Sequence, residues 1–118
     1  MTFDLIRTTA LSLPHVTEVF PFDQSTLVFK VGDKMFLIID IDLQDAITLK
    51  CKPDQIPELL ESHDWISRGF HMNKNHWITL RLDSLKLDIT LVLKLITDSY
   101  SNVYQGLTKK AINAFENR

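Results

Sequence analysis

Two stretches rich in β-branched, aromatic and aliphatic residues, 26–31 and 34–40, are separated only by Gly32 and Asp33. Stretches of this composition are typical of β-strands. A link of two residues joins neighbouring antiparallel strands, and glycine at its first position favours a type II′ turn. The sequence therefore predicts a β-hairpin within a β-rich block. Further strands are expected at 46–52 and 77–82, with a short one within 16–22.

Helical periodicity flanks and interrupts the β-rich block. Residues 2–12 and 88–103 each place apolar side chains three or four positions apart, the spacing of one helical face. Pro14 ends the first helix, a short helix is expected over 54–62, and Thr108 is suited to begin a last one. This order of helices and strands along the chain predicts an α+β fold, a twisted antiparallel sheet with helices packed on one face.

The composition limits the chain to one ordinary domain over 1–118. Of its 118 residues 45% are hydrophobic, and the formal net charge is −2. A chain of this length buries roughly two-thirds of its unfolded surface, enough for a core without disulfides or metals. The longest apolar run, 35–39, is far too short to cross a membrane, so we expect a cytoplasmic protein. The net charge excludes a strongly basic nucleic-acid binder.

Alternation along the strands divides the sheet into two faces, because successive strand side chains point to opposite sides. The predicted core face carries Leu27, Phe29, Val31, Ile47, Leu49, Cys51, Ile78, Leu80 and Leu82. The opposite face carries Val28, Lys30, Thr48, Lys50, Lys52, Trp77, Thr79 and Arg81. If helices cover only the core face, the other face presents an indole among several cations.

Such a surface suits nucleic acid, because cations neutralise phosphates and an aromatic ring stacks on a base for about 1–3 kcal/mol. Arg68 and Lys74 lie close in sequence and extend the cationic set. The same alternation is equally typical of a solvated sheet face with no ligand, on which tryptophan packs beneath lysine stems. The pattern alone leaves both interpretations open.

The segment 69–77 is the densest in reactive side chains. His71 and His76 are five residues apart around an expected turn and could meet as metal ligands, but no third ligand has a diagnostic spacing. Asn73 and Asn75 favour a tight turn. We therefore expect no metal, and the histidines to act as turn and hydrogen-bonding residues.

No catalytic motif accompanies these residues. Cys51 falls on the predicted core face, where a thiol behaves as a small apolar group. Asp40, Asp42 and Asp45 cluster near a strand end without the glycine or glutamate of an EF-hand, which favours a solvated acidic loop. We expect no enzymatic activity and no cofactor.

Several segments together resemble the MmcQ/YjbR-like family of small bacterial proteins. They are 11–18, 20–22, 26–36, 48–51, 69–77, 99–100 and 107–110, and the run 71–77 is the most specific. The chain departs from the family pattern where His15 replaces a glycine, Asn75 a lysine or arginine, and Thr108 a proline. The missing cation at 75 weakens any inference of anion binding there.

The resemblance implies a frataxin/CyaY-like α+β fold, and it implies DNA binding, since members of the family are commonly labelled so. It does not imply the iron handling of frataxin, which uses an acidic ridge on the first helix. The corresponding helix here offers only Asp4, followed by Arg7.

The leading hypothesis is a non-enzymatic protein that binds nucleic acid, double-stranded DNA in particular, through the open sheet face and the 71–77 turn. The alternative is a protein- or small-ligand-binding module on the same face. No membrane partner is expected, and the protein is expected to be a monomer or weak homodimer. The expected binding residues are Lys30, Lys50, Lys52, Arg68, His71, Asn73, Lys74, His76, Trp77 and Arg81.

Overall fold

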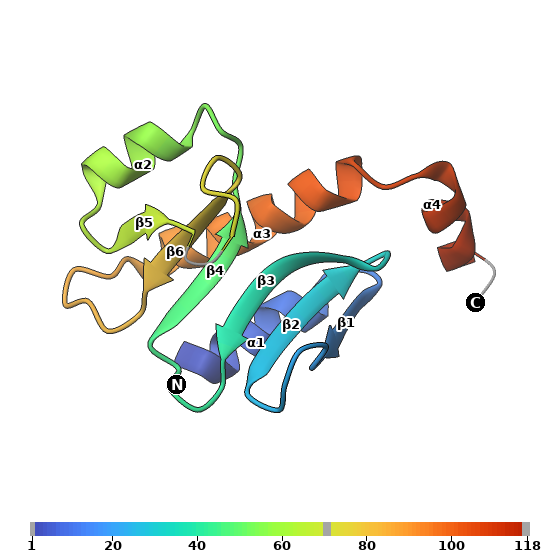
Figure 1. Ribbon diagram of the computed structural model, residues 1–118, viewed down its shortest axis with the longest axis horizontal. Helices are drawn as coiled ribbons and strands as arrows, with labels where there is room; N and C mark the ends of the chain where they lie inside the picture. Colours follow the sequence, from blue (N-terminus) through green and yellow to red (C-terminus); the bar gives the residue numbers. More distant parts are fainter. Residues whose placement is uncertain (1, 70–71, 117–118) are drawn as a thin grey trace.

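A six-stranded antiparallel sheet in the order β1-β2-β3-β4-β6-β5 forms the centre of the protein (Figure 1). The computed structural model describes residues 2–69 and 72–116. The strands are β1 (Val16–Val19), β2 (Thr26–Val31), β3 (Lys34–Asp40), β4 (Ala46–Lys50), β5 (Ile66–Arg68) and β6 (Trp77–Arg81). The helices are α1 (Thr2–Ser12), α2 (Ile56–Ser62), α3 (Ile89–Gln105) and α4 (Lys109–Glu116).

The helices α1 and α3 cover one face of the sheet, as predicted, and lie behind it in Figure 1. Apolar side chains of both helices, among them Ile6 and Ile96, are fully buried in one core with Phe29 and Leu49 of the sheet. All the side chains assigned to the core face belong to this core or pack against it. The α+β architecture is therefore confirmed, because the periodicities of two and 3.6 residues identify strands and helices locally.

One local prediction needs correction, and one strand was not predicted. The hairpin between β2 and β3 forms, but Gly32 and Asp33 have φ of 56° and 67°. Positive φ at both central positions defines a type I′ turn rather than type II′, and its twist matches that of the flanking strands. The short edge strand β5 was not expected, because it contributes only three residues, of which Ile66 alone is buried.

The uncovered face of the sheet is less open than alternation suggests. Val28 is 0% exposed, although it lies outside the main core, and Trp77 and Thr79 are each 8% exposed. Val28 stands between Val19 of β1 and Ile38 of β3, so neighbouring side chains enclose it without a covering helix. The prediction that the indole of Trp77 is presented on an open surface is therefore wrong.

The strands β3 and β4 pair over only three residues and then diverge. In Figure 1 they separate from a shared end, and α3 passes behind the place where they part. Beyond the last pair, the buried hydroxyl of Ser99 on α3 accepts a hydrogen bond from the Lys50 N–H at 2.9 Å and donates one to the Phe36 carbonyl at 2.6 Å. One side chain from α3 thus joins the two strands where a direct bond between them would otherwise lie.

Candidate functional site

The divergence of β3 and β4 opens a cleft of about 370 Å³ at one end of the sheet. Its walls come from both strands, from the first residue of β6 and from the C-terminal end of α3. The residues that line this cleft are Lys34, Met35, Lys50, Trp77, Asn102, Val103 and Gly106. Two lysines, an indole and a carboxamide therefore share one cleft with the apolar side chains of Met35 and Val103.

Trp77 forms a largely buried wall of the cleft. Gly69, the residue after β5, packs against it so closely that a Cβ added there would lie 2.5 Å from the Trp77 Cβ. The Gly69 N–H also donates to the Trp77 carbonyl at 2.7 Å. Within the described part of the chain, the indole N–H of Trp77 makes no hydrogen bond, and no fully buried side-chain nitrogen lacks a partner. The indole N–H therefore keeps access to solvent while most of the ring is buried.

A second, smaller hollow of about 210 Å³ adjoins the cleft through Lys50. Lys52 and His76 line it together with Lys50, and the Cys51 N–H donates to the His76 carbonyl at 2.8 Å. Three of the residues predicted from sequence are thus brought together beside a fourth, Trp77.

Six cations lie at this end of the sheet. Lys30 pairs with Met35 of the cleft, and the exposed Arg68 and Lys74 frame the turn that leads into Trp77. Among residues 2–69 and 72–116, none of the six makes an ion pair. We call this set the basic end; it consists of Lys30, Lys34, Lys50, Lys52, Arg68 and Lys74.

The opposite end of the same face is acidic. Arg81 lies four residues along β6 from Trp77, a distance of about 13 Å, and its guanidinium group is 3.3 Å from Asp83 and 3.7 Å from Asp45. The hydrogen bond from Arg81 lowers the pKa of Asp83, and the same bond raises the pKa of Arg81. Arg81 is thus neutralised and separate from the other predicted cations.

A groove of about 450 Å³ occupies this end of the face and is the acidic groove below. Its floor includes the hydroxyls of Thr48 and Thr79, 3.1 Å apart. The acidic groove is lined by Thr26, Ile38, Asp40, Leu43, Asp45, Ala46, Thr48, Ser67, Thr79 and Arg81.

Two side chains at the turn before β6, those of Asn73 and Arg68, form hydrogen bonds within the protein. The Asn73 side chain accepts from the Asn75 N–H at 2.9 Å, and the Asn73 carbonyl accepts from the N–H groups of His76 and Trp77. The Arg68 guanidinium donates to the Lys74 carbonyl at 2.9 Å. Asn73 therefore shapes the turn rather than offering its amide oxygen to a ligand.

The structure does not test whether His71 and His76 meet, because His71 lies outside the described residues. Over 2–69 and 72–116, no group of three or more histidine, cysteine or acidic residues is arranged to hold a metal ion.

Cys51 directly follows β4, which ends at Lys50, and is buried on the core face. Burial raises the pKa of its thiol, and the charge of Asp98 raises it further. The thiolate needed for nucleophilic chemistry is thus disfavoured.

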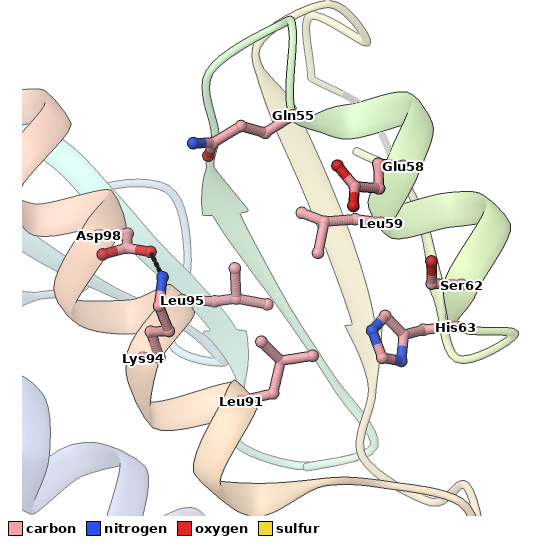
Figure 2. Close-up of a pocket in the computed structure, with 9 residues that line it drawn as sticks. All are labelled: Gln55, Glu58, Leu59, Ser62, His63, Leu91, Lys94, Leu95 and Asp98. Atoms are coloured by element: carbon pink, nitrogen blue, oxygen red, sulfur yellow. Dashed lines mark hydrogen bonds and ion pairs between the residues drawn. The ribbon is translucent and has the colours of Figure 1, made fainter.

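A further hollow of about 260 Å³ lies on the helical side, between α2 and α3 (Figure 2). Leu59 of α2 faces Leu91 and Leu95 of α3 across it, and Lys94 and Asp98 form an ion pair of 2.7 Å at its margin. It is smaller than most ligand pockets, which begin near 300 Å³, and we interpret it as a packing seam between two helices.

Sequence reasoning missed three residues of this region. Lys34 pairs with Val31 of the core face, and Asn102 lies on the α3 helix, so alternation groups neither with the lysines of the uncovered face. Ser99 carried a usable signal, because it is a polar residue among the apolar positions Ile96, Tyr100 and Val103 of one helical face.

Comparison with known proteins agrees with this architecture. The model of the YjbR family matches residues 11–102. The chain belongs to the YjbR family. Within the family, it is 35% identical over 103 residues to the uncharacterised protein YbdF of Escherichia coli O157:H7, covering 86% of this chain and 83% of that protein. It is 26% identical over 111 residues to the uncharacterised YjbR of Escherichia coli K12, covering 93% of each.

Two solved structures share the fold of this family member. A Deinococcus radiodurans crystal structure with a DUF419 domain superposes with a TM-score of 0.86 at 36% identity, over 97% of this chain and 87% of that one. A Pseudomonas syringae protein gives 0.65 at 25% identity, over 82% and 93%. The frataxin-like designation stays a prediction. In the described ranges, no helix is long and apolar enough to cross a membrane.

Proposed function

We propose that this YjbR-family protein is a non-enzymatic nucleic-acid-binding protein that holds phosphates at the basic end. The observation that carries the proposal is the separation of charge along the uncovered face. The cations of the basic end have no carboxylate partner in the described ranges, whereas Arg81 at the far end is neutralised by Asp45 and Asp83. Unpaired ammonium groups neutralise phosphates and release condensed counterions, which is the main source of affinity for a polyanion.

The net charge of −2 is compatible with this proposal because attraction depends on the local field. Asp33 and Asp54 are the acidic residues next to the basic end in sequence, so its cations outnumber them. The acidic groove repels phosphate and so orients the polyanion toward the basic end.

Titration of fluorescently labelled duplex DNA at two salt concentrations tests the proposal. We expect the affinity to fall with salt, with a logarithmic slope of about −0.9 for each phosphate neutralised. The double variant Lys50→Ala/Lys52→Ala should reduce that slope by roughly 1.8. A matched control is Lys86→Ala/Lys94→Ala, which removes equal charge from residues that already pair with carboxylates. Absence of binding at low salt, or equal losses in both double variants, would refute the proposal.

The second candidate function is the small-ligand- or protein-binding module, which is favoured by the volume of the acidic groove. At about 450 Å³ it falls within the usual size range of small-molecule sites, about 300–1,000 Å³. Immobilised protein exposed to nuclease-treated bacterial lysate distinguishes the two candidates. A partner that survives nuclease, is lost in Thr48→Lys and is retained in Lys50→Ala supports this candidate.

A further inference from the structure

The cleft between β3 and β4 is lined by more than the cations that phosphate contact requires. Lys34 of β3 and Lys50 of β4 line the cleft where the two strands diverge. The helix α3 contributes Asn102 and Val103 to the same cleft. A polyanion held only at the surface would use the ammonium groups and leave the rest of the cleft unused. The apolar and carboxamide side chains therefore favour a ligand that has apolar surface and hydrogen-bonding groups as well as negative charge.

Trp77 supplies a second, independent indication of a ligand. Trp77 is 8% exposed and lines the cleft, and its indole N–H, which keeps access to solvent, has no partner within the described residues. It is therefore a donor that a bound molecule can reach without displacing an internal hydrogen bond. A ligand that enters the cleft with an oxygen or nitrogen acceptor would satisfy this donor.

The charge balance of the cleft favours an anionic group at its entrance. The C-terminal end of α3, with a partial charge of roughly −0.5, lies at the cleft and opposes an anion. The two ammonium groups of Lys34 and Lys50 contribute opposite charge of about four times that size, so the entrance is cationic.

We propose that the cleft accepts one unstacked nucleotide of a single-stranded nucleic acid. This inference rests on the proposed function and specifies its ligand. The phosphate lies on Lys34 and Lys50, and the base enters between Met35 and Trp77, where its edge accepts from the indole N–H and pairs with the Asn102 carboxamide. A duplex keeps its bases stacked and paired, so it can reach the lysines but cannot place a base in a cleft of about 370 Å³.

The experiment compares a labelled single strand of mixed sequence with its own duplex by fluorescence anisotropy. We expect the single strand to bind about tenfold more tightly, the effect of one base held against an aromatic side chain. Trp77→Phe keeps an aromatic ring but removes the N–H, and should weaken the single strand about threefold to tenfold while leaving the duplex unchanged. Asn102→Ala, on partly exposed α3 surface, should act in the same direction without altering the sheet.

Competition separates a nucleotide site from a simple phosphate site. Thymidine monophosphate should displace the labelled single strand at concentrations at which inorganic phosphate does not. Equal competition by both, or equal affinities for single strand and duplex with no effect of Trp77→Phe and Asn102→Ala, overturns this inference. In that case salt-dependent binding that is weakened by Lys50→Ala still supports the proposed function, whereas failure of both nucleic acids to bind refutes the proposed function itself.

Discussion

Replacing Ser99 by alanine removes the hydroxyl that joins β3 to β4. In the native protein this hydroxyl, which is 0% exposed, accepts from the Lys50 N–H at 2.9 Å and donates to the Phe36 carbonyl at 2.6 Å. Both backbone groups lose their partner in the variant, and an unsatisfied buried group costs about 1–3 kcal/mol. Partial closure of the two strands would let the N–H and carbonyl bond directly, so we expect a net loss of about 2 kcal/mol.

Chemical denaturation of Ser99→Ala, compared with wild type, measures this loss. For a domain of this length, the same loss lowers the melting temperature by roughly 6–10 °C. Ser101→Ala is the matched control, because Ser101 lies on the same helix and its side chain makes no hydrogen bond within residues 2–69 and 72–116. A free energy of unfolding that is the same in both variants would refute the bridging role of the Ser99 hydroxyl.

Three further predictions concern other parts of the fold. Gly69→Ala places a Cβ 2.5 Å from the Trp77 Cβ, so we expect a loss of about 1–3 kcal/mol in urea unfolding; an unchanged midpoint would contradict the close approach. Because burial raises the pKa of Cys51, folding stability should decline as the pH rises past about 8.5, and Cys51→Ala should lessen that decline in unfolding titrations unless the thiol titrates normally in the folded state. The ring of His15 stacks on Phe115 with centroids 4.2 Å apart. His15→Ala should therefore speed hydrogen exchange in α4 about twofold to tenfold, and unchanged exchange would show that other contacts hold that helix.

Local patterns determined which segments form strands and helices. The strands β2 and β3 have the predicted bounds, and the Thr108 hydroxyl accepts from the Ala111 N–H at 3.1 Å at the start of α4, as predicted. Gly106 ends α3, with its N–H bonded to the Val103 carbonyl at 3.1 Å. These features depend on residues within a few positions of one another, so the sequence carries the information directly.

Such local patterns do not predict side-chain contacts between residues that are far apart in the chain. Alternation assigned Trp77 to the uncovered face correctly, yet its exposure depends on how closely the chain at Gly69 approaches it. Alternation also grouped Arg81 with the other cations, although Asp45 and Asp83 neutralise it at the opposite end of the face.

The sequence by itself determined a YjbR-family α+β domain with lysines on one face of its sheet. Only the tertiary structure decided that this face has a basic and an acidic end, and that a cleft opens at the basic one. The cleft, for example, depends on one hydroxyl that bonds to both of the diverging strands. Ser99 lies 63 residues from Phe36 and 49 from Lys50, and it links them only because α3 packs across the diverging strands.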